Sequence, residues 1–202
     1  YSVALFSSVF WNTQILGFIL EKATGLTLTD YMYQKIWEPI GASSQAFWSL
    51  DKESGDEKSF CCLYATARDF SRLGTLILHD GKLNGKQIIP IWYLNEMIKT
   101  SSMNTDDGVE NMRYGWHIWV YKNQGKPIHY FRGLKGQYII VVPHLNRVIV
   151  RLGEKRGGHY KIPEKEIKNT SYRSINDERL GHTVDLFEYL NIANRIVSQS
   201  RP

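Results

Sequence analysis

The sequence has little cysteine, and what it has lacks the spacing of metal or redox sites. Its two cysteines, Cys61 and Cys62, are adjacent. Zinc and redox sites are typically spaced CxxC, so we expect two separate, buried small hydrophobic side chains instead. The six histidines are scattered, and no HExxH pair is present. A structural metal is therefore not expected.

Long hydrophobic runs are also missing. No apolar stretch approaches the ~20 residues that a bilayer-spanning helix needs, so no membrane-spanning segment is expected. Acidic residues are slightly fewer than basic ones: the sequence has 20 Asp and Glu and 25 Lys and Arg. Much of the basic excess lies in residues 155–179. For this segment we favour a solvated loop over a nucleic-acid-binding surface, because no recognition helix or aromatic-basic stacking motif accompanies the charge.

What is present is typical of a globular protein. Hydrophobic residues make up 43% of the 202 residues and charged residues 22%, which is enough apolar material for a full core. The chain begins at Tyr1, with neither an initiator methionine nor a signal-peptide pattern, so the compartment cannot be read from it. We expect a fragment, or a chain whose beginning is missing.

The first half is predicted to be mostly helical. Apolar residues recur at helical spacing over 12–24, and Gly25 supplies a stop. Thr27 with Asp30, and Thr66 with Asp69, are capping-box pairs that predict helices over about 28–37 and 67–78. A further short helix is predicted over 91–98, after a proline.

The second half is predicted to be strands followed by a helix. Four β-rich runs (116–121, 128–131, 138–142 and 147–152) are separated by short turns, which indicates an antiparallel meander. An amphipathic helix is predicted over 184–197. The predicted class is α+β, an antiparallel sheet flanked by helices. We expect a mostly helical subdomain over 1–110, and the strands with the C-terminal helix over 111–202.

The hairpin in residues 131–153, FRGLKGQYIIVVPHLNRVIVRLG, is the most informative stretch. Gly133 and Gly136 come directly before its first strand. Glycine there means either that a ligand approaches the backbone closely or that the chain needs a tight bend, and the bend is the more common reason.

Three blocks together resemble the serine β-lactamase and penicillin-binding-protein-like superfamily, and within it the class C-like esterase and nylon-oligomer hydrolase branch. They are NTQILGFILEKATGLTLTDYMYQKIWEPIGA, residues 12–42, then ATARDFSRLG, residues 65–74, and the hairpin. The resemblance extends to Gly153 and implies a β-lactamase/transpeptidase-like fold. It also implies a serine hydrolase acting on amide, ester or β-lactam bonds through an acyl-enzyme, with no metal or organic cofactor.

The resemblance also assigns roles to residues of the hairpin. Phe131-Arg132-Gly133 occupies the place of the family's Lys-Thr-Gly strand. The backbone N–H of Leu134 then becomes the candidate oxyanion donor, and Gly133 lets the substrate lie against the backbone. With Phe131 in the place of lysine, the substrate preference shifts from penicillins towards amides or esters. Arg132 either replaces the missing cation in the cleft or is a solvated arginine on a strand.

The nucleophile is where the chain departs from the family. Ser49-Leu50-Asp51-Lys52 matches Ser-x-x-Lys literally, but it follows the Leu16-Gly17 helix where the family's nucleophile precedes it, so a surface turn is expected. Counting back from that helix, the family's tyrosine motif should fall at Ser8 and Phe10, and neither residue fits. By itself this chain is expected to be inactive.

Three functions remain in competition. The first is part of a serine hydrolase with a small-molecule or peptide-like substrate. The second is an inactive relative that binds peptide or cell-wall fragments in the same cleft. The third, a nucleic-acid-binding domain, rests on charge alone and would bind with affinity that falls steeply with salt. Oligomeric state leaves no trace in the sequence, and a periplasmic or exported bacterial location is implied by the resemblance only.

Overall fold

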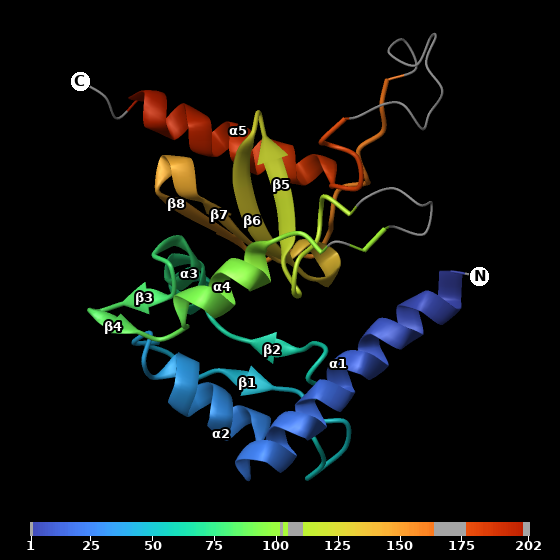
Figure 1. Ribbon diagram of the computed structural model, residues 1–202, viewed down its shortest axis with the longest axis vertical. Helices are drawn as coiled ribbons and strands as arrows, with labels where there is room; N and C mark the ends of the chain where they lie inside the picture. Colours follow the sequence, from blue (N-terminus) through green and yellow to red (C-terminus); the bar gives the residue numbers. More distant parts are fainter. Residues whose placement is uncertain (1, 102, 105–110, 164–176, 200–202) are drawn as a thin grey trace.

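A four-stranded antiparallel sheet forms the centre of the computed structural model, which describes residues 2–101, 103–104, 111–163 and 177–199 (Figure 1). The strands pair in chain order, so the sheet is the predicted meander. With helices on both faces, the predicted α+β class is confirmed. The strands are β5 (Trp119–Asn123), β6 (Lys126–Arg132), β7 (Tyr138–Val142) and β8 (Arg147–Arg151).

Two details of the meander reflect local backbone preferences. The β5–β6 turn is formed by Gln124 (φ 51°) and Gly125 (φ 77°), both left-handed, as expected for the tightest hairpin turns. β5 begins later than predicted, at Trp119. The reason is a turn in which Gly115 N–H donates to the carbonyl of Ile118 at 2.9 Å, with His117 in a left-handed conformation.

The helices agree with their capping signals. Thr27 and Thr66 each accept a hydrogen bond from the amide three residues later, at 3.0 and 3.1 Å, as a capping box requires. Gly25 ends the first helix in a left-handed conformation. The second predicted helix is a short α-helix that continues as one π-helical segment. The elements are α1 (Ser2–Thr24), α2 (Leu28–Met32), η1 (Tyr33–Trp37), α3 (Ala67–Leu78), α4 (Ile91–Ile98) and α5 (Val184–Gln199).

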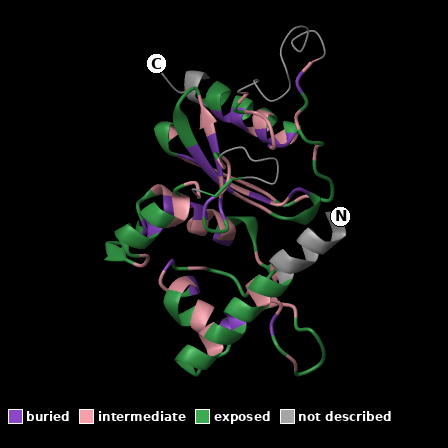
Figure 2. Cartoon of the chain, turned by 45° about the vertical axis from the view of Figure 1, so that its right-hand side comes forward, coloured by how far each residue is buried: buried purple, intermediate pink, exposed green. Residues whose placement is uncertain are grey.

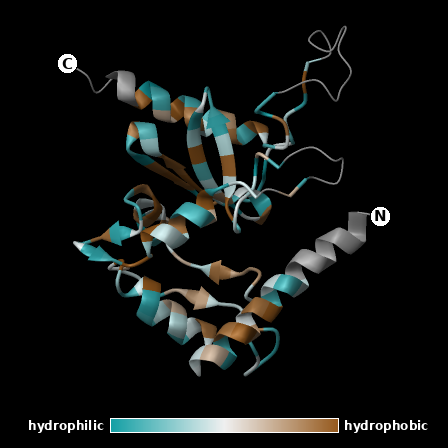
Figure 3. Ribbon diagram, viewed as in Figure 1, coloured by the Kyte–Doolittle hydropathy of each residue, from teal (hydrophilic) through white to brown (hydrophobic). Residues whose placement is uncertain are grey.

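The two faces of the sheet pack against different helices. Apolar and aromatic side chains of β5, β6 and β7 form one core with α5, and Leu186 and Leu190 are its helical members. On the other face α3 packs against β7 and β8 so closely that a Cβ on Gly74 would meet Val148 Cγ1 at 2.4 Å. Buried residues gather along the strands of the sheet (Figure 2), whereas strongly hydrophobic residues lie both on these strands and along α1 (Figure 3). The subdomain division at residue 110 stays a prediction.

The remaining strands form two-stranded ribbons, which the sequence did not predict. β1 (Phe47–Trp48) pairs with β2 (Leu63–Tyr64), and β3 (Lys82–Leu83) pairs with β4 (Lys86–Gln87). With two residues each, these strands are too short to show an alternating pattern. None of the helices in the described ranges combines the length and the hydrophobicity that crossing a bilayer requires.

The prediction for the two cysteines was wrong. Cys61 and Cys62 are half-buried rather than buried, and they form a disulfide with each other. Their Cα atoms are 3.7 Å apart, and Cys62 has a left-handed backbone (φ 72°). Sequence rules consider spaced cysteines because most disulfides join more distant Cα atoms, so they do not recognise an adjacent pair.

Candidate active site

The turn after β6 contains the predicted oxyanion donor. Pairing between β6 and β7 ends at Arg132 and Tyr138, and Gly133 N–H then donates to the carbonyl of Gln137 at 2.9 Å. Between them Leu134–Gly136 form a single 3₁₀ turn, in which Gly136 takes φ 82°. The turn therefore presents the Leu134 amide at its outer end, after the last paired residues of the hairpin.

The Leu134 amide is the candidate oxyanion donor. Among the residues that the structure describes, none accepts a hydrogen bond from it. Leu134 as a residue is 71% exposed, so the turn faces outward. A Cβ at Gly133 would meet Gln137 Cβ at 3.0 Å, which means that the space beside this glycine is taken by the hairpin itself. The bend interpretation of Gly133 is thus sufficient to explain why it is glycine.

Side-chain hydrogen bonds of Gln137 and Arg151 fix this turn to β8 and to the chain after it, and sequence reasoning missed them. The Gln137 side chain donates to the carbonyl of Gly153 and accepts from its amide at 3.0 Å. Arg151 Nη1 donates to the carbonyls of Gly136 and Lys155, at 2.6 and 2.7 Å. A signal was available, because Gln137 follows Gly136 directly in the hairpin, residues 131–153, that resembles the family. These contacts hold the Leu134 amide in a fixed place before any ligand arrives.

Phe131 and Arg132 do not face the same side of the sheet. Successive strand residues point to opposite faces. Phe131 packs against the core formed by Ile77, Leu94 and Val141, on the α3 side. The structure therefore does not bring Phe131 and Arg132 together as one binding surface.

Arg132 is half-buried and not the solvated arginine of one expectation. Its guanidinium lies 3.7 Å from the centre of the Trp119 ring, in a cation–π contact. Its Nη1 is buried, and no described residue accepts a hydrogen bond from it. Burial lowers the pKa of Arg132 from its ordinary value, and the group remains charged at neutral pH. Arg132 is thus a partly desolvated cation, and its Nη1 has no acceptor among the described residues.

A chain of buried and half-buried polar groups lies on the same side of the sheet. The Tyr130 hydroxyl and His182 Nδ1 share a hydrogen bond of 2.7 Å. Tyr138 donates to Asp185 at 3.0 Å and shares a 2.7 Å bond with Thr183, and burial raises its pKa to about 12. Sequence reasoning did not find this network, because its members lie 45 to 52 residues apart along the chain.

The buried histidines make stability depend on pH. Burial, with the charges of Arg113, Arg132 and His159, lowers the pKa of His182 to about 3, and burial lowers that of His129 to about 4. Unfolding restores a value near 6.5, so the unfolded state binds more protons below that pH. The stabilisation of the fold by the two neutral histidines is complete above about pH 6.5. It is lost as the pH falls towards 4, the pKa of folded His129, and then 3, that of folded His182.

We expect the free energy of unfolding to fall by about 2 kcal/mol per histidine between pH 7 and pH 5. The measurement is urea denaturation at both pH values. His182→Gln cannot take up the proton, so its change between the two pH values should be smaller by that amount. Parallel pH profiles for His182→Gln and the wild type would contradict the assignment of a neutral, buried His182.

Ser49-x-x-Lys52 lies in a surface turn, as predicted. The Ser49 amide donates to the carbonyl of Cys62 at 3.0 Å and its carbonyl accepts from Lys58, within the β1–β2 connection. Lys52 is exposed and lies in a tight turn, not on a helix that would bring it over Ser49. The positions considered for the tyrosine motif, Ser8 and Phe10, have side chains outside the described residues, as has much of the basic segment 155–179.

Two cavities lie away from the Leu134 turn. A groove of about 690 Å³ runs between the β5–β6 turn and α5, over Tyr121 and Phe187. A smaller cavity of about 320 Å³ is lined by Trp37, Trp48 and Leu63, among others. Neither is lined by Arg132, Gly133 or Leu134.

Comparison with known proteins identifies related hydrolases. The family described as Beta-lactamase matches residues 6–164. A 6-aminohexanoate-dimer hydrolase from Paenarthrobacter ureafaciens is 25% identical over 147 residues, which are 70% of this chain and 37% of that protein. A solved structure from Bacillus anthracis, described provisionally as a 6-aminohexanoate-dimer hydrolase, matches with a TM-score of 0.70 and 25% identity. That match covers 92% of this chain and 43% of the other, so the chain spans less than half the length of either relative.

Proposed function

This chain belongs to the Beta-lactamase family, and from that membership we propose that it is part of a serine hydrolase that cleaves an amide or ester bond through an acyl-enzyme. The relatives that match it are hydrolases of the nylon-oligomer branch, as the three sequence blocks predict. Because the chain spans 37% and 43% of these two relatives, the activity is proposed for the intact protein that contains these 202 residues.

The observation that carries the proposal is the Leu134 amide, from which no described residue accepts a hydrogen bond, in a turn that is already fixed. When a serine attacks a carbonyl, negative charge develops on the carbonyl oxygen, and donors placed there in advance stabilise it. Gln137 and Arg151 hold the turn, so the amide needs no reorganisation during the reaction. We assign the Leu134 N–H as one of these donors.

The nucleophile and its base are assigned to a part of the intact protein outside this chain. A serine hydroxyl is a poor nucleophile at neutral pH and needs a neighbouring base to take its proton. Ser49 is held in a surface turn with Lys52 exposed, so it does not meet this need. A Ser-x-x-Lys motif elsewhere would supply both groups, and the Leu134 turn would complete the site.

Arg132 gives the substrate class. A half-buried guanidinium with a donor that no described residue uses would bind a carboxylate more strongly than a solvated arginine would. We propose a linear amide or ester that ends in a carboxylate, a class that includes the 6-aminohexanoate dimer named for the relatives.

Arg132→Gln should raise KM ten- to hundredfold for a carboxylate-ended amide, because a hydrogen bond to a charged group contributes about 1.5–3 kcal/mol. The matched control is the methyl ester of the same substrate, for which KM should not change. Arg132→Lys keeps the charge but not the planar fork. Its KM for the carboxylate-ended amide should therefore lie between that of the wild type and that of Arg132→Gln. Equal losses on both substrates would show that Arg132 is structural only.

A binding-only relative is the second candidate function. Phe131 in the place of the family's lysine favours it, since that position here packs into the core and carries no charge. Such a protein would hold peptide or cell-wall fragments at the same turn without cleaving them.

Acylation separates the two functions. We expect the intact protein to gain the mass of one fluorophosphonate probe, and to lose this labelling when the serine of its Ser-x-x-Lys motif is replaced by alanine. Ser49→Ala is the matched control and should label fully. No mass shift, together with retained binding of a peptide, would favour the binding role. Loss of labelling in Ser49→Ala would overturn the assignment of the nucleophile.

A further inference from the structure

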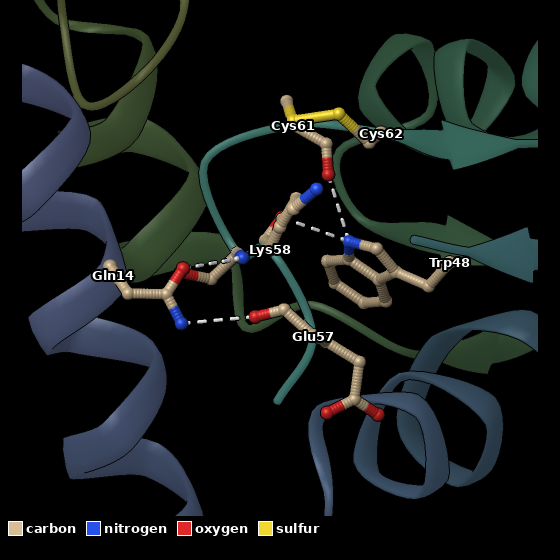
Figure 4. The surroundings of a disulfide bond; sticks show 7 residues. Gln14, Trp48, Glu57, Lys58, Cys61 and Cys62 are labelled. Carbon is tan, nitrogen blue, oxygen red and sulfur yellow. Dashed lines mark hydrogen bonds between the residues drawn. A yellow bond between two sulfur atoms is a disulfide. The ribbon is translucent and has the colours of Figure 1, made fainter. Parts of the chain in front are cut away.

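The disulfide lies within a short loop that leads into β2 and contacts Trp48 of β1 and the helix α1. Residues 57–62, here named the cystine loop, join the charged turn after β1 to β2, and Cys61 and Cys62 are the only cysteines of the chain. Figure 4 shows the pair at the end of the loop, above the Trp48 indole. Both cysteines are half-buried rather than enclosed in the core.

The carbonyls of the cystine loop hold Trp48. The indole Nε1–H is shared between the carbonyls of Cys61, at 2.8 Å, and Lys58, at 3.0 Å (Figure 4). The carbonyl of Cys62 accepts from the Ser49 amide at 3.0 Å. The direction of these two cysteine carbonyls depends on the backbone at Cys62, which is left-handed.

The same loop attaches α1. Gln14 donates to the carbonyl of Glu57 at 3.0 Å and accepts from the Ser59 amide at 3.1 Å. The Ser59 hydroxyl donates to the carbonyl of Thr13 at 2.8 Å. Gly17 packs so closely that a Cβ there would meet Ser59 Cβ at 2.9 Å. A change in the loop backbone would therefore reach both Trp48 and α1.

We propose that Cys61–Cys62 is a thiol–disulfide exchange site for low-molecular-weight thiols, and that its redox state sets how firmly the cystine loop holds Trp48 and α1. A left-handed backbone is unfavourable for a residue with a Cβ. The disulfide ring restricts Cys62 to this conformation. Once the bond opens, Cys62 is free to take an ordinary backbone conformation, and the carbonyls turn away from Trp48 and Ser49.

Reduction of the disulfide consumes two molecules of a monothiol, R–SH. The first thiolate attacks one cysteine sulfur, the Cys61–Cys62 bond breaks, and the other cysteine leaves as a thiolate that takes up a proton. The second R–S⁻ attacks the reductant's sulfur in the mixed disulfide and releases the first cysteine, which also takes up a proton. In total, the protein gains two electrons and two protons, and the reductant becomes R–S–S–R.

Alkylation tests the exchange directly. Native protein should take up no N-ethylmaleimide under air and two equivalents after incubation with glutathione, as read from the intact mass. Peptide mapping then assigns the adducts to Cys61 and Cys62, the two cysteines of these 202 residues. Labelling without reductant would overturn the proposal, and so would a disulfide that glutathione opens only after the protein is unfolded.

Tryptophan fluorescence and two matched variants test the coupling to the loop. Reduction should change the emission of the wild type, and Trp48→Phe should abolish that change. Cys61→Ser/Cys62→Gly and Cys61→Ser/Cys62→Ala both lack the disulfide, but glycine adopts the left-handed conformation freely. We expect the glycine variant to show the fluorescence emission of the oxidised wild type. Its Tm should be ~2–4 °C above that of the alanine variant. Reduction without an emission change, or identical behaviour of the two variants, would overturn the coupling.

Discussion

Leu134→Pro is expected to lower kcat of the intact enzyme by on the order of 10²–10³, the usual effect of removing one oxyanion donor. The substitution removes the amide hydrogen and little else. Leu134 begins the 3₁₀ turn, a position that proline favours, and Gly133 before it is extended (φ −98°, ψ 174°), as a residue before proline should be. No hydrogen bond to a described residue is lost, since none accepts from this amide.

Leu134→Ala is the matched control. It keeps the amide and removes a side chain that is 71% exposed, so kcat should change only a few-fold and stability by less than about 0.5 kcal/mol. The measurement is steady-state hydrolysis of one ester substrate by the three proteins, with thermal unfolding as the check on folding. If both variants lose activity equally, the Leu134 side chain and not its amide is the functional group.

Asp69→Ala is expected to lower the free energy of unfolding by about 3–5 kcal/mol, the largest stability effect we predict. Asp69 is fully buried at the start of α3. It accepts hydrogen bonds from the Ser43 amide at 2.8 Å and the Thr66 hydroxyl at 2.8 Å, and Arg72 Nε lies 3.7 Å away. Alanine would leave these donors and the Arg72 charge without their acceptor.

Asp69→Asn is the control variant that keeps the shape of the side chain. It keeps one acceptor oxygen but removes the charge, so its loss should be smaller than that of alanine. Burial alone would raise the pKa of Asp69, but the hydrogen bonds from Ser43 and Thr66 outweigh burial and hold the pKa below its usual value. Its contribution is therefore present above about pH 4 and is lost as the pH falls through the folded pKa, a loss that Asp69→Asn should not show. Urea denaturation gives both results, and an alanine variant within about 1 kcal/mol of the wild type would contradict this account of Asp69.

The parts of the fold that local chemistry decides could be predicted from the sequence. The Thr66–Asp69 capping box gives α3 its observed start, and the left-handed Gln124-Gly125 pair gives the β5–β6 turn its place. The alternation of side chains along β6 and β7 follows from strand geometry alone. Four strands with short connections leave few arrangements besides the observed meander.

The parts that depend on distant residues could not be predicted. The Tyr130–His182 pair joins residues 52 positions apart, and nothing in either segment indicates the other. The Cys61–Cys62 disulfide depends on a left-handed backbone at Cys62, which no composition rule anticipates. In the candidate site, the resemblance of the hairpin to the family predicted the position of the Leu134 turn. It did not predict the contacts of Gln137 and Arg151 that hold this turn. Nor did it place Arg132 over Trp119.

A crystal structure of the intact protein after reaction with a fluorophosphonate tests the oxyanion assignment most directly. The phosphonyl oxygen stands in for the negatively charged oxygen of the tetrahedral intermediate. We predict that it lies ~2.7–3.1 Å from the Leu134 amide nitrogen, with the Gln137–Gly153 contacts unchanged. A phosphonyl oxygen bound by other donors, and not by the Leu134 amide, would contradict the role proposed for this turn.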